Sequence, residues 1–312
     1  MSRRPRSAPL VVRLLREGIT ESIHYCDVAV ADHRGRIIAA AGDFEHPIFA
    51  RSCLKPIQAL PVVTTGTLDR FHLNDRHLAL MCGSHQGTIE QSRLVFHILW
   101  QCDVEPEYLK CPKGDRDSSL QHNCSGKHAG MLAVCRQQNW DIATYTDRDH
   151  PVQQLIREKL GELLHMPPAE LVYAHDDCTA PTYLLEIGQL ASLYAFLSGY
   201  EHLHLERIAR AMTTYPELVA GKGEFDTEVM TVTGGTILSK SGAEGLQCLG
   251  KIAEGLGIAI KVADGSKRAK QAVAIYVLRQ LGWVESAITD QLADTFARVG
   301  EFSRLEVEGE LT

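Results

Sequence analysis

Hydrophobic and polar residues alternate near the start of the chain, most clearly over residues 23–31. The two interleaved sets are Tyr25, Asp27, Ala29 and Cys26, Val28, Val30. A period of two is typical of an antiparallel strand with one covered face. Two more β-rich runs, residues 10–16 and 36–41, are separated from it by Gly-containing turns. The chain therefore opens with three predicted strands.

Helical patterns dominate the middle of the chain. Thr88 and Gln91 make a capping-box pattern that predicts a helix from about 89 to 102. Pro151 suits a helix start and predicts a helix to about His165. The other predicted elements are a loop over 110–124, a helix around Met131–Cys135, a short strand from Val172 to a polar turn at Asp177, helices at about 181–198 and 203–214, and a mobile loop over 216–223.

Strands return in the last quarter of the chain. They are predicted at residues 236–240, 246–252 and 257–263, and helices follow at 266–281 and 286–297. An order of strands, helices and strands favours an α+β fold in which strands from both ends share one antiparallel sheet flanked by helices. We expect a single domain over residues 1–312, with a helical subregion at about 85–215, because neither an internal repeat nor a linker is evident.

Composition narrows the function classes. The 312 residues are 45% hydrophobic and carry a net charge of −7, which argues against general nucleic-acid binding. The basic residues 2–7 are not followed by a signal-peptide apolar region, and residues 10–15 are too short to cross a membrane. We therefore expect a cytoplasmic protein without a membrane partner. Its nine scattered cysteines are expected to be reduced. Six of them are expected to be small core residues: Cys26, Cys82, Cys102, Cys111, Cys135 and Cys248.

The first candidate for chemistry is a Ser-x-x-Lys sequence. If Ser52 opens a helix, Lys55 lies on the same face with Cβ atoms about 5–6 Å apart, and Pro56 fits a first turn. Such a lysine amine can serve as the base that activates the serine hydroxyl, provided that burial or another cation disfavours its charge. Alone, this spacing is more often that of a solvated helix face.

Two later sequences strengthen this interpretation. Ser84 lies in a Gly-rich loop ahead of a predicted helix, and Lys240 with Ser241 and Gly242 ends a predicted strand. Ser-x-x-Lys, a loop serine and Lys-Ser-Gly occur here in the order found in penicillin-binding proteins and serine β-lactamases. The simpler alternatives are a serine bonded to its own turn and an edge-strand lysine.

Five sequence blocks together resemble the rhizobial-type (class 3) L-asparaginases of the asparaginase II family. These blocks are Arg51-Ser52-Cys53-Leu54-Lys55-Pro56, Cys82-Gly83-Ser84-His85, Asn123-Cys124-Ser125-Gly126-Lys127-His128, Asp176-Asp177-Cys178 and Lys240-Ser241-Gly242-Ala243-Glu244-Gly245. The resemblance implies a β-lactamase-like fold, a homodimer, and hydrolysis of L-asparagine to L-aspartate and ammonia. It makes Ser52 the nucleophile, Lys55 its base, and Ser84 with Lys240 a second Ser–Lys unit.

The same resemblance implies a zinc site. Its ligands would be Cys124, Lys127 and Cys178 with a water, and Asp176 would orient that water and face the substrate together with Arg51 and His128. Two thiolates and an open fourth position suit zinc. Without the resemblance, the two cysteines are better explained as buried thiols. One departure is visible: Asp177 stands where the family usually has glycine. If that position needs a positive φ, aspartate tolerates it better than most residues.

Two alternative functions remain open. One is a glutaminase, or another serine amidase or β-lactamase-like hydrolase, because one methylene group discriminates by only ~1–3 kcal/mol. The other is a zinc-binding sensor or structural protein without catalysis. That alternative predicts metal-dependent folding and no ammonia release. The presence of Ser52, Lys55, Ser84 and Lys240 together argues against it.

Overall fold

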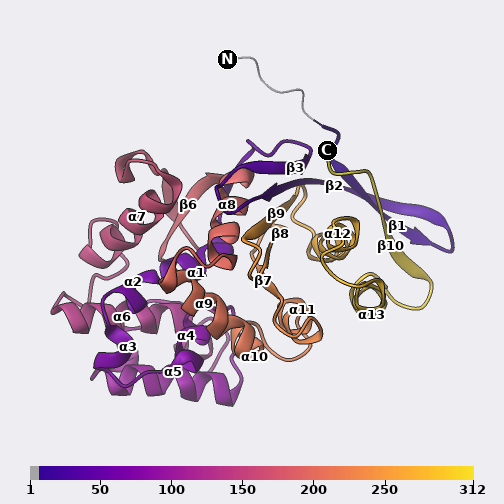
Figure 1. Cartoon of the computed structure of the whole chain (residues 1–312). Coiled ribbons are helices and arrows are strands. Elements are labelled where there is room, and N and C mark those ends of the chain that lie inside the picture. The colour runs from indigo at the N-terminus through magenta and orange to yellow at the C-terminus, as the bar shows by residue number, and fades with distance from the viewer. Residues whose placement is uncertain (1–6) are drawn as a thin grey trace. The chain divides into compact units, whose positions relative to one another are not determined.

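A computed structural model describes residues 7–312 and divides the chain into two compact units (Figure 1). The first unit comprises residues 7–48, 185–200 and 228–312, and the second comprises Phe49–Leu184 and Glu201–Thr227. The unit boundaries fall within β4 (Pro47–Phe49), β6 (Pro181–Glu186) and α11 (Phe225–Val232), and after Tyr200. The expectation of one domain stays a prediction.

An antiparallel sheet forms the first unit. Its strands run in the order β10-β1-β2-β9-β8-β7, and β3 pairs with β2. Their bounds are β1 (Leu10–Arg16), β2 (Ile19–Ala31), β3 (Ile37–Ala41), β7 (Ile237–Ser241), β8 (Leu246–Lys251), β9 (Leu256–Val262) and β10 (Ser303–Glu308). Strands from both ends of the chain therefore share one sheet, which confirms the predicted α+β class.

Helices cover this sheet where its side chains are apolar. The helix α8 (Ile187–Ser198) packs on β2, β8 and β9, and α12 (Lys267–Gln280) packs on β1, β8, β9 and β10. Figure 1 shows α13 (Ser286–Phe296) beside α12. The approach of α8 to β9 requires Gly257, because a Cβ atom there would lie 2.2 Å from the carbonyl oxygen of Ala191.

The second unit is mainly helical. Its helices are α1 (Lys55–Gln58), α2 (Leu60–Thr64), α3 (Thr67–Arg70), α4 (Asp75–Met81), α5 (Ile89–Gln101), α6 (Ser125–Gln138), α7 (Pro151–Leu164), α9 (Leu203–Thr214) and α10 (Pro216–Val219). Four 3-10 turns, η1 (Arg51–Leu54), η2 (Pro106–Tyr108), η3 (Ser119–Gln121) and η4 (Pro168–Glu170), and the strand β5 (Tyr173–His175) complete it. No helix among residues 7–312 is long and apolar enough to cross a membrane.

The helix α6 runs through the core of the second unit. Residues 125–135 of this helix are all buried, and it packs against α4 and α5. A Cβ atom at Gly126 would lie 2.4 Å from the carbonyl oxygen of Leu80 in α4. Glycine at this position therefore allows the first turn of α6, which carries Lys127 and His128, to lie against α4.

The predicted helix over 181–198 is wrong in its first third. Residues Pro181–Glu186 form the strand β6, which pairs with β5 through Tyr173 opposite Tyr183. A proline without an N–H, followed by Thr182 and Tyr183, suits a strand better than a helix once a partner strand is present. The helix α8 begins after Glu186, whose side chain forms a capping box with Gln189.

Candidate active site

Ser52 and Lys55 lie in the tight turn η1 and at the start of α1. Arg51 enters this turn with a φ of 47°, and its N–H donates to Thr182 Oγ1 at 3.0 Å. The N–H of Lys55 donates to the carbonyl of Ser52. Because residues three apart nearly eclipse each other in a 3-10 turn, the Ser52 and Lys55 side chains leave the same face. Pro56 occupies the first turn of α1, as predicted.

The Lys55 amine is fully buried and meets three oxygen atoms. Its Nζ lies 2.7 Å from the carbonyl of Gly83, 2.9 Å from Ser84 Oγ and 3.1 Å from the carbonyl of Asn123. Three acceptors match the three N–H bonds of an ammonium group. Burying a charge without such partners would be costly, so these contacts allow Lys55 to occupy the core.

The same arrangement also accommodates a neutral amine. Gly83 and Asn123 offer carbonyl oxygens, which only accept hydrogen bonds, so they hold two N–H bonds of Lys55 in either protonation state. In the neutral state the nitrogen lone pair can accept the Ser84 hydroxyl proton. Lys55 and Ser84 can therefore exchange a proton without rearrangement of either backbone.

The backbone around Ser84 is held by the α10 segment. The N–H of Ser84 donates to the carbonyl of Val219 at 2.6 Å. A Cβ atom at Gly83 would lie 2.6 Å from the carbonyl of Leu218 and 2.8 Å from that of Val219. The following His85 is buried and bonds Ser125 Oγ through Nε2 at 2.9 Å. The loop that carries Ser84 is therefore tied both to α10 and to the start of α6.

A cluster of two thiols and one amine lies at the start of α6 and in the turn after β5. Lys127 Nζ donates to Cys178 Sγ at 3.1 Å, and the Cys124 thiol also donates to Cys178. Hydrogen bonding from Cys124, opposed by burial and helped by Lys127, lowers the pKa of Cys178 to about 5. The pKa of Lys127 is raised, because attraction to the two cysteines outweighs its burial. These shifts favour the thiolate form of Cys178 beside the ammonium form of Lys127.

These three side chains fit the predicted metal site in their chemistry. Soft thiolates are preferred zinc ligands, and a cation can replace the proton of Lys127 as the positive partner of Cys178. Residues 7–312 contain no group of three or more His, Cys, Asp or Glu side chains that could hold a metal ion. A metal bound to Cys124 and Cys178 would therefore depend on the lysine amine or on a water as a third ligand.

Arg51, Asp176 and Asp177 form a charged group beside this cluster. Arg51 Nε donates to Asp176 Oδ1 at 2.8 Å, and a terminal guanidinium nitrogen donates to Asp177 Oδ2 at 2.5 Å. Asp176 and Arg51 are largely buried, whereas the Asp177 side chain is 92% exposed. The structure thus brings Arg51 and Asp176 together, and the residue that departs from the family pattern pairs with the same arginine.

The left-handed residue of this turn is Thr179 and not the aspartate that stands in place of the family's glycine. Thr179 has a φ of 74°, whereas Asp177 does not have a positive φ. The N–H of Thr179 donates to the carbonyl of Asp176, and the N–H of Asp176 donates to the carbonyl of Ala180. These two bonds close the turn and force the reversal onto Thr179. A β-branched residue in this region is strained, and such strain is found mostly at functional sites.

His128 lies fully buried in the first turn of α6. Its Nδ1 is 2.6 Å from the hydroxyl of Tyr145. Burial and the charge of Lys127 lower the pKa of His128 to about 3, so the ring is neutral at ordinary pH. Sequence reasoning missed Tyr145, because an aromatic residue in the irregular segment between α6 and α7 carries no local signal of function.

Lys240 belongs to the first unit and lies on β7. It is fully buried, and its Nζ donates to the carbonyl of Ser241 at 2.7 Å. Ser241 Oγ in turn donates to Gln247 of β8. The sequence paired Ser84 with Lys240, and that pairing stays a prediction. Within its own unit, the Ser84 hydroxyl contacts the Lys55 amine.

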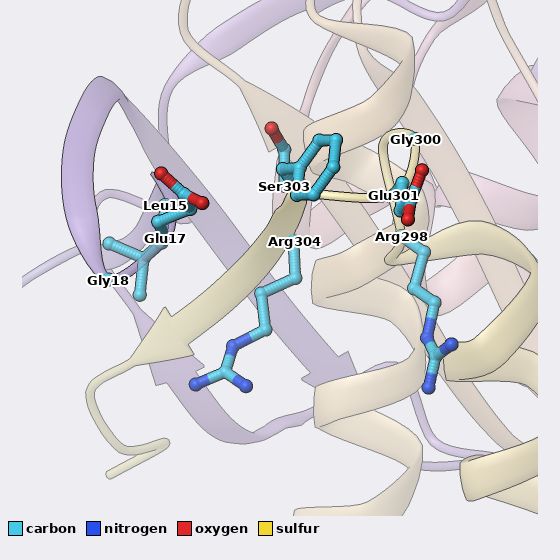
Figure 2. Close-up of a pocket in the computed structure, with 9 residues that line it drawn as sticks. Leu15, Glu17, Gly18, Arg298, Gly300, Glu301, Ser303 and Arg304 are labelled. Atoms are coloured by element: carbon cyan, nitrogen blue, oxygen red, sulfur yellow. The ribbon is translucent and has the colours of Figure 1, made fainter.

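Two cavities lie away from all of these residues. One of about 510 Å³ in the first unit is lined by residues of the β1–β2 turn and the start of β10, among them Glu17, Arg298 and Arg304 (Figure 2). Arg298 pairs with Asp294, and Arg304 pairs with Glu306. The second cavity, of about 620 Å³, lies at the C-terminal ends of α3, α5 and α6. Neither is lined by a predicted catalytic or metal-binding residue.

Comparison with known proteins gives a family and a fold. The model of the L-asparaginase II family matches residues 12–312. Among solved structures, Mglu is similar at a TM-score of 0.51 with 14% identity, over 82% of this chain and 66% of that chain. Mglu in its native form in the presence of 4.3 M NaCl is similar at a TM-score of 0.50 with 15% identity, over 82% and 60%. A β-lactamase (Mb2281c) from Mycobacterium bovis matches at a TM-score of 0.36 with 12% identity, over 87% and 95%.

The extent of these matches limits what they show. The chain spans between 60% and 66% of the length of the Mglu chains. At 14–15% identity, this likeness shows the fold alone. No curated protein matches the chain.

Proposed function

The chain belongs to the L-asparaginase II family, and from this premise we propose that it hydrolyses the side-chain amide of L-asparagine to L-aspartate and ammonia. Family membership makes it a hydrolase of the asparaginase type. The observation that carries the finer proposal is the buried Lys55 amine, which bonds Ser84 and lies one turn from Ser52. A lysine that bonds one serine hydroxyl and lies one turn from another serine is suited to move protons to and from a serine nucleophile.

In the proposed first half-reaction, Ser52 Oγ bonds to the amide carbon while Lys55 accepts the hydroxyl proton. The carbonyl oxygen becomes an oxyanion, for which backbone N–H groups near Ser52 are the proposed donors. The carbon–nitrogen bond then breaks as the nitrogen receives a proton from Lys55 through Ser84. Ammonia leaves, and an aspartyl ester of Ser52 remains.

In the second half-reaction, water adds to the ester carbon and gives a proton to Lys55. The bond to Ser52 Oγ breaks, and the oxygen recovers its proton from Lys55. The contact of 2.9 Å between Lys55 and Ser84 supports this relay, since two carbonyls already hold the other N–H bonds of the amine. Lys240 is proposed to assist Ser84 as a second cation.

Arg51, His128 and Asp176 are proposed to bind the zwitterionic part of the substrate. A guanidinium group suits the α-carboxylate, and a carboxylate suits the α-ammonium group. Arg51 and Asp176 contact each other at 2.8 Å and could exchange this bond for bonds to a ligand that carries both charges. A cytoplasmic location, expected from the sequence, and a homodimer, implied by the resemblance, are part of the same proposal.

Zinc is proposed to bind to Cys124, Lys127 and Cys178. When bound, it would supply a Lewis acid and would bring the first turn of α6 and the turn after β5 together. The support is the thiolate of Cys178, which two hydrogen-bond donors hold inside the protein.

Protein purified without chelators is expected to contain about one zinc ion per chain. Cys178→Ser is expected to lose most of this zinc, because a hydroxyl is a much poorer zinc ligand than a thiolate. Cys102→Ser is the matched control: its thiol is buried in the same unit, and burial raises its pKa to about 12. Metal content by mass spectrometry checks both. Zinc far below one per chain in the wild type would contradict the site.

The function itself is tested by comparing three substrates. The wild type is expected to release ammonia from L-asparagine with a kcat/KM about 10–200-fold above that for L-glutamine, the range that one methylene group provides. Nitrocefin hydrolysis is expected to be far slower. Preference for glutamine would indicate a glutaminase, and preference for nitrocefin would overturn the asparaginase proposal. A folded protein that needs zinc to fold and releases no ammonia would instead support the non-catalytic alternative.

A further inference from the structure

A buried chain of hydrogen bonds ends at His128. The backbone N–H of Lys110 donates to the hydroxyl oxygen of Tyr145 at 2.9 Å, and this hydroxyl lies 2.6 Å from His128 Nδ1. Tyr145 and His128 are both fully buried, and their rings meet edge to face with an interplanar angle of 86°. The other ring nitrogen, His128 Nε2, is buried and has no hydrogen-bond partner among residues 7–312.

The positions of the donors decide where the protons lie. A backbone N–H can only donate, so the Tyr145 oxygen accepts from Lys110 and its own proton is free to go to His128 Nδ1. A neutral imidazole that accepts at Nδ1 carries its proton at Nε2. The opposite tautomer would leave both the phenol proton and Nε2 without partners. The tautomer with N–H at Nε2 leaves one unsatisfied group, and it is therefore favoured.

The segment that carries Tyr145 is fixed from both sides. The Asp141 carboxylate accepts from the Ala143 N–H and from Thr144 Oγ1, which closes a turn just before Tyr145. The carbonyl of Tyr145 accepts from Gln153 Nε2 of α7 at 2.8 Å. The backbone that carries the phenol is therefore held by bonds to the chain on either side of it.

The unsatisfied Nε2–H belongs to the proposed active site. His128 follows Lys127 in the first turn of α6, and Lys55 and Asp176 lie close enough to act on it electrostatically. A buried donor without an acceptor destabilises the folded protein. Each such group calls for an explanation, and a bound molecule is one of them. An acceptor oxygen of a bound substrate would satisfy this one.

We propose that Tyr145 is a positioning residue that holds His128 with its proton at Nε2, so that His128 presents one fixed N–H donor to a carbonyl or carboxylate oxygen of the substrate. The substrate part of this inference rests on the proposed amide hydrolysis. The tautomer part rests only on the hydrogen bonds around Tyr145, so the two parts can fail separately.

The tautomer is measured by ¹⁵N NMR of the histidine ring nitrogens, with the His128 signals assigned from their loss in His128→Gln. The wild type is expected to show a protonated Nε2 and an unprotonated Nδ1. In Tyr145→Phe, which removes only the hydroxyl, the two nitrogens are expected to move toward averaged shifts as the second tautomer appears. Tyr183→Phe, at a buried tyrosine in the same unit, is the control and is expected to leave the His128 signals unchanged.

Ammonia release tests the substrate part. Tyr145→Phe is expected to lower kcat/KM for L-asparagine about 10-fold or more, since one misplaced hydrogen bond is worth about 1.4 kcal/mol. His128→Gln retains an N–H donor near the Nε2 position and is expected to keep more activity than His128→Ala. In the His128→Gln background the Tyr145→Phe effect is expected to disappear, because glutamine has no tautomer to select.

Three results would overturn the proposal. They are a wild type protonated at Nδ1, an unchanged tautomer in Tyr145→Phe, and a Tyr145→Phe loss of activity that persists in the His128→Gln background. If the wild type releases no ammonia, the substrate part falls with the proposed function. The NMR result still decides the role of Tyr145 in that case. Zinc content is matched across the variants, so that a change in metal is not mistaken for a change in donor.

Discussion

Ser52→Ala is expected to lower kcat for ammonia release from L-asparagine by about 10⁴-fold or more, because no other group can form the ester intermediate once the nucleophile is removed. Ser84→Ala is expected to lose less, about 10²–10³-fold, since it removes a proton relay and leaves the attacking hydroxyl in place. Purified variants would be compared with the wild type under saturating substrate, and an ester trapped on Ser52 would be sought by mass spectrometry.

A buried serine outside the site provides the control for these two variants. Ser192 Oγ bonds the carbonyls of Gly35 and Gly188, and Ser192→Ala is expected to keep full activity. If Ser84→Ala proves the more damaging change, the direct contact between Ser84 and Lys55 marks Ser84 as the nucleophile. If both variants remain active, the Ser–Lys mechanism is wrong.

Lys55→Met is expected to abolish proton transfer and to lower kcat by about 10³-fold or more. Its effect on folding is expected to be much smaller. The substitution leaves the carbonyls of Gly83 and Asn123 without a donor, but it also removes a buried cation whose desolvation is costly. The free energy of unfolding in urea is expected to change by no more than about 2 kcal/mol. The variant is therefore expected to lose most of its activity while it keeps most of its stability.

Two further substitutions sharpen this result. Lys55→Arg keeps a positive charge but cannot act as a base, so it is expected to be as inactive as Lys55→Met. Lys159→Met makes the same chemical change at a residue on α7 that pairs with Glu162, and it is expected to leave activity intact. Activity retained in Lys55→Arg would mean that Lys55 supplies charge and does not transfer protons.

Much of the fold could be predicted from local patterns. The capping box of Thr88 and Gln91 and the first-turn proline Pro151 begin their helices where the sequence indicated. The strand β10 was missed although Ser303–Glu308 alternates charged with apolar residues, because the run is short and its partner β1 lies at the other end of the chain. The strand β6 was mistaken for helix because its extended conformation depends on pairing with β5.

Part of the candidate site could likewise be predicted from the sequence, and part depended on tertiary packing. Residue types and spacing were enough to select Ser52, Lys55 and the thiols of Cys124 and Cys178, because the chemistry of a nucleophile, a base and a metal ligand depends on the side chain itself. They could not show that Lys55 bonds Ser84, since the two are 29 positions apart and their distance depends on how α10 and the start of α6 pack against the loop that carries Ser84.

The sequence by itself determined the α+β class, the family and the residue types available for Ser–Lys chemistry, because periodicity, caps and motifs are local properties of the chain. Tertiary structure alone decided which of these groups meet. It joined Arg51 to Asp176, placed the strained φ on Thr179, and set Tyr145 against His128. Each of these contacts links segments whose approach depends on helix and strand packing, which no window of sequence contains.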